Sequence, residues 1–392
     1  MADLKVYTDK FVLSPGPTEI PDEIRLALAR KTTNPDLDPD FRQEYEQASR
    51  KLAALLGALE HDVLIMMGEA MLGLEASVVS LLDRGQKAII VSNGVFGEGF
   101  AELVRAHGAI PIEVRLDWRR RLDASKVAEA LDSNPDARVV YAVHCETPTG
   151  VLNGLEELGR IASRSGAVLV VDCVSSAGGA RIEASAWNID VLIVGSQKAL
   201  NLPSGLTIMA INEKAWEAIE KRRPGGFYLN LALWRSYARG AAEMPPHTLS
   251  DSMVYALNAS LDAFFREGPT NVFARHELAK RACWRAAEAL GLEPYPSSEE
   301  DASPTVTALL APESVNSEAL RLKVWRKCGI MLGGGVGPLR GRVIRVGHMG
   351  FTASRSHVIL AISALARGLV DEGLISRRDY AAAIEAAESV FE

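Results

Sequence analysis

Short apolar runs alternate with helix-like segments over the first two-thirds of the chain, and this alternation constrains the fold most. Helical spacing of apolar residues predicts helices at 20–30, 41–59, 72–83, 98–107, 124–133 and 154–165. Strand-like runs span residues 61–67, 87–92, 109–115, 138–144, 167–171, 190–194 and 205–211. Strands that alternate with helices form a mostly parallel sheet covered on both faces, so we predict an α/β fold. Ligands of such sheets bind outside the carboxyl ends of the strands.

The pattern changes in the last third of the chain. Helices are predicted at 252–266 and 271–290, after an irregular Pro- and Gly-rich stretch at 221–251. Strands at 305–310, 329–332 and 342–346 and helices at 317–327, 355–371 and 376–390 follow, joined by short loops. This is typical of a smaller α+β domain. We predict a large domain at residues 16–270 and a small one at 271–392 together with 1–15.

Composition excludes several classes of partner. The 392 residues carry a net charge of −7, which gives no electrostatic case for nucleic acid or an anionic membrane. No run reaches the ~18 apolar residues of a membrane span, and MADLKVYTDK has no apolar signal core. The four cysteines, Cys145, Cys173, Cys283 and Cys328, are widely spaced without a CxxC. We expect reduced thiols in a cytoplasmic protein, with no zinc site.

Two strand ends carry groups that complement each other chemically. The run 167–171 ends in Asp172, and the run 190–194 is followed by Gly-Ser-Gln and Lys198. A lysine after a strand is most often a solvated loop residue, but the separation of these two fits one strand-to-strand crossover. Burial would lower the pKa of the lysine and make it an amine nucleophile. A pyridoxal cofactor needs this pair, an amine for attachment and a carboxylate for its pyridinium proton.

Two further segments have both a structural and a functional interpretation, and a third is interpreted only as surface. Residues 68–71 (GEAM) form a glycine turn that opens a helix, which leaves N–H groups free for an anion, although most such turns bind nothing. Phe96 lies in the turn 93–97, where an aromatic residue is more often core than a ring-stacking platform. The charged run 117–123 (DWRRRLD) is predicted to be a solvated surface.

Seven motifs then follow one another in a recognisable order. They are PGPTE (15–19), HCETPTG (144–150), VDCVSSAGG (171–179), GSQKAL (195–200), ARH (274–276), SPTVTA (303–308) and IRVGHMG (344–350). Together they resemble the class V, fold-type I pyridoxal-phosphate aminotransferases, and the resemblance covers nearly the whole chain. Within that class, the chain is most similar to the group of alanine–glyoxylate, serine–glyoxylate and pyridoxamine–pyruvate aminotransferases. The resemblance implies transfer of an amino group between a small amino acid (alanine or serine) and a small 2-oxo acid (pyruvate or glyoxylate). It also implies a homodimer with the active site at the subunit interface.

The resemblance implies a role for each matching position. Lys198 would form the Schiff base with pyridoxal 5′-phosphate and carry the proton between Cα and C4′, while Asp172 would pair with the pyridine nitrogen. Arg345 would clamp the substrate carboxylate, although an arginine there could instead close an edge-strand ion pair. The other candidates are Phe96 and Val174 on the ring faces, Thr147 at the 3′-oxygen, Glu69, Ala70, Met71, Gln197, His247 and Thr248 at the phosphate, and Gly16 beside the substrate. His348 is interpreted as structural.

The phosphate turn departs from the family pattern, which usually has Ser-Gly-Thr or Ser-Gly-His where this chain has Glu69-Ala70-Met71. At ~4 Å and an effective dielectric of ~20, a carboxylate and one phosphate charge repel by about 4 kcal/mol. Three arrangements would avoid this repulsion. Glu69 points away from the phosphate, Glu69 is protonated, or the site accepts a ring without phosphate. The stretch GEAMLGLEA is similar to the turn of the pyridoxamine–pyruvate members, which take free pyridoxal and pyridoxamine. Two positions differ from those members. Val336 stands where they have a second arginine, and His247 stands where they have a bulky aromatic residue. The loop 244–248 would come from the partner subunit.

Other functions stay open or are rejected on specific grounds. A cysteine desulfurase-like lyase needs a reactive cysteine on a mobile loop, and Cys145, Cys173 and Cys328 are poorly placed for that. Residues 333–337 form a glycine-rich look-alike of a dinucleotide loop, but not within a βαβ unit. A non-catalytic binding module is disfavoured because the amine and the carboxylate are both present.

Overall fold

A central seven-stranded sheet organises the computed structural model, which describes residues 10–223 and 225–392. The strand order is β2-β10-β9-β8-β5-β3-β4, and β10 runs antiparallel to both of its neighbours. The other pairs are parallel, so the predicted α/β fold with a mostly parallel sheet is confirmed. The strands are β2 (Asp62–Met67), β3 (Lys87–Ser92), β4 (Ile110–Arg115), β5 (Val139–Val143), β8 (Val168–Asp172), β9 (Val191–Gly195) and β10 (Leu206–Ile211).

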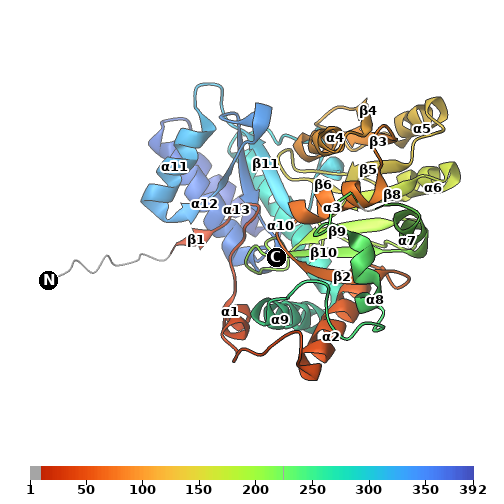
Figure 1. The fold of residues 1–392 in the computed structure, drawn as a ribbon. Helices are drawn as coiled ribbons and strands as arrows, with labels where there is room; N and C mark the ends of the chain where they lie inside the picture. The colour runs from red at the N-terminus through yellow and green to blue at the C-terminus, as the bar shows by residue number, and fades with distance from the viewer. Residues whose placement is uncertain (1–9, 224) are drawn as a thin grey trace.

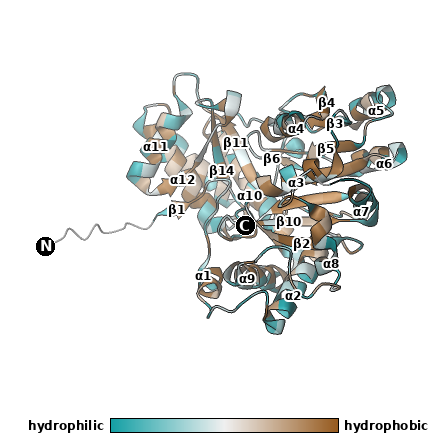
Figure 2. Ribbon diagram, viewed as in Figure 1, coloured by the Kyte–Doolittle hydropathy of each residue, from teal (hydrophilic) through white to brown (hydrophobic). Residues whose placement is uncertain are grey.

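The central strands are apolar throughout because helices cover both faces of the sheet. Every residue of β5, β8, β9 and β10 is buried. Figure 2 shows these strands in the colour of hydrophobic residues, while the outer faces of the surrounding helices are hydrophilic. The helices that pack around this part of the sheet are α3 (Met71–Leu81), α4 (Val95–Ala106), α5 (Ala124–Ser133), α6 (Glu156–Ser165) and α7 (Glu213–Glu220).

A second helical layer lies beside β2, at the bottom of Figure 1. It consists of α1 (Asp22–Leu28), α2 (Pro39–Leu55) and α9 (Asp251–Glu267). The start of α2 follows from local sequence, because Asp38 accepts the N–H of Asp40 and proline stands at the first helical position. The segment before α9 contains the single turns η1 (Leu231–Trp234) and α8 (Arg235–Ala238).

The C-terminal elements, turquoise to blue in Figure 1, form a second unit beside the main sheet. Its antiparallel sheet has the order β11-β14-β13, and β1 pairs with β12 in parallel. The strands are β1 (Phe11–Val12), β11 (Val306–Leu310), β12 (Ile330–Met331), β13 (Gly333–Gly334) and β14 (Val343–Gly347). The helices are α10 (Pro269–Ala289), α11 (Ser317–Cys328), α12 (Arg355–Asp371) and α13 (Arg377–Glu388), with short turns η2 (Glu299–Asp301), η3 (Gly337–Leu339) and η4 (Gly350–Thr352).

The division into domains at 16–270 and at 271–392 with 1–15 stays a prediction, and residues 1–9 lie outside the described residues. Two separate hydrophobic cores support it. One extends from Ile24 to Val272, and the other joins Leu13 to residues 279–387. No helix in the described part of the chain combines the length and apolar character needed to cross a membrane.

Two local predictions need correction, and one helix was missed. Helix α4 begins at Val95 rather than at 98, so Phe96 lies in its first turn. Helix α7 was not predicted. The run 117–123 is not simply a solvated surface, because Arg119 donates to the Tyr295 carbonyl at 2.8 Å and Arg121 pairs with Asp301 at 2.6 Å. These arginines tie the large sheet's edge to the C-terminal unit, which local charge patterning does not reveal.

Candidate active site

A cavity of about 120 Å³ lies at the carboxyl ends of the central strands. Nine of the predicted residues line it together, from the turn before α3, the start of α4 and the segments after β6 (Cys145–Glu146), β8 and β9. They are Glu69, Ala70, Met71, Phe96, Thr147, Asp172, Val174, Gln197 and Lys198, and Leu74, Cys145 and Ser175 complete the wall. The short strand β6 pairs with β7 (Val151–Leu152).

Lys198 reaches the cavity under the loop that precedes the first helix. Its Nζ donates to the Pro15 carbonyl at 2.6 Å, and its own carbonyl accepts the Thr18 hydroxyl at 3.0 Å. Burial and, to a smaller extent, the charge of Arg345 lower the pKa of Lys198 to about 8, against the opposing effects of Cys145 and Asp172. About a tenth of the side chain is therefore free amine at pH 7, far more than for an ordinary lysine.

Gly16 leaves the space that the lysine occupies. A Cβ at this position would lie 2.3 Å from Lys198 Cδ and 2.6 Å from Nζ, and the backbone has φ +100°. Both the close approach and the positive φ require glycine. Gly16 thus lies against the reactive amine.

Asp172 is the last residue of β8 and is buried, with 5% of its surface exposed. Its Oδ1 accepts the N–H of Val174 at 2.8 Å, which holds the carboxyl group and the neighbouring wall residue in one turn. Burial raises the pKa of Asp172 to about 6, against the effects of that hydrogen bond and of Lys198. The group is ionised at neutral pH, as a partner of a protonated ring nitrogen must be.

Arg345 projects from β14 beside the cavity. Its Nε donates to the Gly334 carbonyl at 2.7 Å and its Nη1 to the Thr147 carbonyl at 3.2 Å. Arg345 makes no ion pair with any residue that the structure describes, so the edge-strand ion pair considered above is not formed. Burial lowers its pKa to about 10, which leaves it charged at neutral pH. His348 bonds to Pro304 and Thr307 in the core, as expected of a structural residue.

Glu69 lines the cavity but turns back onto its own helix. Its Oε2 accepts the N–H of Met71, the first residue of α3, at 3.0 Å. Its carbonyl accepts the Thr207 hydroxyl at 2.7 Å, which fixes the turn from the other side. One of the amides that an anion at this helix start would use is therefore already bonded to a carboxylate.

His247 and Thr248 do not line the cavity of their own chain. The ring of His247 stacks on Tyr228 at a centroid distance of 4.4 Å, and Thr248 Oγ1 lies 3.4 Å from a carboxylate oxygen of Asp36. The prediction that these residues serve a partner's site therefore stays a prediction.

Glu146 is a functional candidate that the sequence reasoning missed. Its buried carboxyl group accepts the backbone N–H of Gly97 at 2.6 Å and of Phe96 at 3.2 Å. Burial raises its pKa to about 7. The available signal was its place inside the HCETPTG motif, between two residues that line the cavity.

None of the cysteines has the properties of a nucleophile. Burial raises the pKa of Cys145 to about 11 and of Cys283 to about 12, and it raises those of Cys173 and Cys328 as well. A desulfurase needs an accessible thiolate, so the structure gives the lyase alternative no support.

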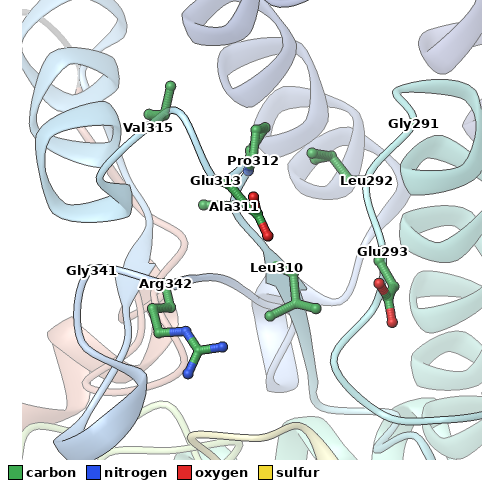
Figure 3. Close-up of a pocket in the computed structure, with 10 residues that line it drawn as sticks. All are labelled: Gly291, Leu292, Glu293, Leu310, Ala311, Pro312, Glu313, Val315, Gly341 and Arg342. Atoms are coloured by element: carbon green, nitrogen blue, oxygen red, sulfur yellow. The ribbon is translucent and has the colours of Figure 1, made fainter.

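A larger opening of about 500 Å³ lies in the C-terminal unit. Figure 3 shows Leu310 there between the side chains of Arg342 and Glu293. It contains none of the predicted residues and no lysine, histidine or cysteine. Size therefore does not identify the site.

The residues of the smaller cavity fit a vitamin B6 ring. Lys198 would supply an amine for attachment and Asp172 a carboxylate for the ring nitrogen, and Phe96 and Val174 would pack on the ring faces. The described residues include no group of three or more side chains arranged to hold a metal ion.

Comparisons with known proteins agree with this chemistry. The family model "Aminotransferase class-V" matches residues 11–337. The pyridoxamine–pyruvate transaminase of Mesorhizobium japonicum is 33% identical, with 90% of each chain covered. The serine–glyoxylate aminotransferase of Methylorubrum extorquens is 28% identical over 92% of this chain and 91% of the other. The crystal structure of the Mesorhizobium loti pyridoxamine–pyruvate aminotransferase superposes with a TM-score of 0.92 at 31% identity, covering 98% of both chains. The chain therefore belongs to the class V aminotransferases, which have fold type I and use pyridoxal 5′-phosphate.

Proposed function

We propose that this protein transfers an amino group between a small amino acid, alanine or serine, and a small 2-oxo acid, pyruvate or glyoxylate. The observation that carries the proposal is one cavity lined by Lys198 and Asp172, with the charged Arg345 at its side. Relatives whose names specify pyruvate or glyoxylate as acceptor support this choice of substrates.

Each residue contributes a defined step. The cofactor, when bound, supplies the electron sink that makes the substrate Cα–H acidic. Asp172, ionised above about pH 6, keeps the ring nitrogen protonated. Lys198 would hold the cofactor and, once the substrate amine has replaced it there, would move the proton at Cα as a free amine whose pKa suits neutral pH. Phe96 and Val174, which both line the cavity, would hold the two faces of the ring.

Arg345 binds the substrate carboxylate. Two backbone carbonyls hold its guanidinium before substrate arrives, which reduces the entropy lost on binding. Because both bonds go to neutral acceptors, the positive charge stays available for a carboxylate. Gly16 supports the same site by keeping the substrate side of Lys198 free of a side chain.

The bond between Glu69 and Met71 favours a second candidate, in which free pyridoxamine is the amino donor and pyruvate the acceptor. A phosphate at the start of α3 would have to displace the carboxylate or lie beside it, at a repulsive distance. A neutral hydroxymethyl group meets neither obstacle. The similarity to pyridoxamine–pyruvate transaminases supports this candidate, while Val336 and His247 count against it.

Purified protein separates the two candidates. A phosphate-bearing yellow chromophore that survives dialysis, with turnover of alanine or serine against glyoxylate or pyruvate, supports the first. Loss of the ring on dialysis, with turnover of added pyridoxamine and pyruvate, supports the second. Lys198→Ala should abolish transamination and the visible absorbance in both cases, and retained turnover would refute the role of this lysine.

Variants of Glu69 test the reason for the choice. Glu69→Gln and Glu69→Ser should strengthen binding of pyridoxal 5′-phosphate but not of pyridoxal. Glu60→Gln removes an exposed carboxylate just before β2 and serves as the control. Equal affinities in all variants would mean that Glu69 does not govern phosphate binding.

We further propose a cytoplasmic homodimer in which the loop 244–248 completes the partner's site. Exposed apolar side chains in and beside this loop support burial against a second copy: Met244 has 53% of its surface exposed, and Phe227, which contacts His247, has 78%. The absence of any disulfide among the four cysteines fits a reducing compartment. Sedimentation of the wild-type protein tests the oligomer, and a monomer with full activity would contradict a shared site.

A further inference from the structure

The carboxyl group of Glu146 has no part in the steps above, yet it is completely buried beside the cavity. It lies at the start of α4, a twelve-residue helix whose N-cap is Gly94 and which has no side-chain cap of its own. Its two oxygens accept the N–H groups of Gly97 and Phe96 at 2.6 and 3.2 Å. Glu146 therefore caps α4 from a segment distant in the sequence.

The surrounding chain is shaped to admit this carboxyl group. A Cβ at Gly94 would lie 2.3 Å from Glu146 Cδ. The backbone of Gly94 is extended, with φ 174°, so space rather than conformation requires glycine. A side chain larger than hydrogen would push the carboxyl group off the helix.

Glu146 also connects the cap to the substrate side of the cavity. Its carbonyl accepts the N–H of Gly150 at 2.8 Å, which closes the turn that carries Thr147. The Thr147 carbonyl in turn accepts Arg345 Nη1. One residue thus links the aromatic wall and the arginine that faces the substrate.

We propose that Glu146 is a positioning residue that holds Phe96 against the vitamin B6 ring through the first N–H groups of α4. The inference rests on the proposed function, because it needs a ring in the cavity. Above about pH 7 the carboxyl group of Glu146 is ionised and offers an acceptor to both N–H groups. A glutamine of the same shape offers one acceptor and turns an N–H₂ group toward the second donor.

Glu146→Gln tests the proposal, with Glu98→Gln as the matched control. Glu98 is an exposed carboxylate in the first turn of the same helix. Above about pH 7, where Glu146 is ionised, loss of one charge-assisted hydrogen bond should weaken binding of pyridoxal 5′-phosphate or pyridoxal about tenfold. The visible circular dichroism of the bound ring should fall as well. Glu98→Gln should change the dissociation constant less than twofold.

A double-mutant cycle shows whether Glu146 acts through Phe96. Glu146→Gln should lose most of its effect on affinity and circular dichroism in a Phe96→Leu background. Should Glu146→Gln not fold, Gly94→Ala displaces the same carboxyl group without removing it, and the same losses are expected.

Wild-type-like affinity and dichroism of both Glu146→Gln and Gly94→Ala would overturn the proposal. So would additive effects in the cycle, which indicate a general structural role. A wild-type protein that binds neither pyridoxal 5′-phosphate nor pyridoxal would overturn the proposed function and this inference with it. A wild-type protein that shows the visible absorbance of a bound ring upholds the proposed function. The variants then test the role of Glu146 alone.

Discussion

The buried amine of Lys198 should make the cofactor-free enzyme less stable than a variant with an apolar side chain of similar length. The pKa falls from 10.5 to about 8 on folding. At 1.36 kcal/mol per unit, this corresponds to a cost of about 3 kcal/mol at pH 7. Lys198→Met removes that cost together with the hydrogen bond to Pro15, worth about 1 kcal/mol. We expect an inactive variant that is about 2 kcal/mol more stable at pH 7.

The pH dependence gives this prediction its sign. Between pH 8 and 10.5 the unfolded chain binds the lysine proton and the folded chain does not. The stability of the wild type therefore rises with pH across this window. At pH 10 the free-energy cost of burying the Lys198 amine is under about 1 kcal/mol, no more than the hydrogen bond to Pro15 contributes. Lys198→Met should therefore be no more stable than the wild type at that pH.

Urea unfolding at pH 7 and pH 10 measures both values, on protein stripped of its cofactor until the visible absorbance of the ring is gone. Lys126→Met, at an exposed lysine that pairs with Glu129 on α5, controls for loss of a positive charge and should change stability by less than about 0.5 kcal/mol. A Lys198→Met variant no more stable than wild type at pH 7, or equally stabilised at pH 10, would refute the reasoning.

Three other substitutions test separate parts of the site. Gly16→Ala should lower kcat at least about tenfold, because the new Cβ would displace the Lys198 side chain and because alanine is strained at the positive φ of residue 16. An unchanged kcat in steady-state assays would contradict the close approach of the two residues. Arg345→Lys should raise KM for the amino acid and the oxo acid about ten- to a hundredfold, because a point charge replaces a fork held by two carbonyls, and equal KM values would remove the arginine from carboxylate binding. Arg119→Ala should lower the free energy of unfolding by up to about 1 kcal/mol through loss of its bond to Tyr295, and a change in cofactor affinity would show that this contact reaches the cavity.

The sheet and the cavity floor were predictable because the signals are local and repeated. Strands β5, β8 and β9 are buried on both faces, so their sequences are continuous runs of apolar residues. The carboxyl ends of neighbouring parallel strands lie at one edge, so Asp172 and Lys198 had to be near each other once β8 and β9 were adjacent. Topology alone brought the amine and the carboxylate together.

The start of α4 was not predictable in the same way. Its sequence, Asn-Gly-Val-Phe-Gly, has turn residues and no local cap, so a helix was expected only from residue 98. The missing acceptor comes from Glu146, 50 residues further along the chain. Charge patterning failed at Arg121 for the same reason, since its partner Asp301 is 180 residues away. The strand pattern predicted Asp172 and Lys198 to be neighbours because they follow adjacent strands, but no pattern in the sequence links Glu146 to α4 or Arg121 to Asp301.

Glu69 shows how a conflict in the sequence can direct attention to function. A carboxylate at an expected phosphate turn left three possibilities, and the structure shows a fourth, a carboxylate that binds the helix-start amide of Met71 while still lining the cavity. On the proposed function, this makes cofactor choice a competition for one N–H group. A phosphate dianion must displace a group of its own charge, whereas a hydroxymethyl group can leave that hydrogen bond intact. Discrimination between the two rings then depends on the protein's own anion at α3 rather than on the size of the cavity.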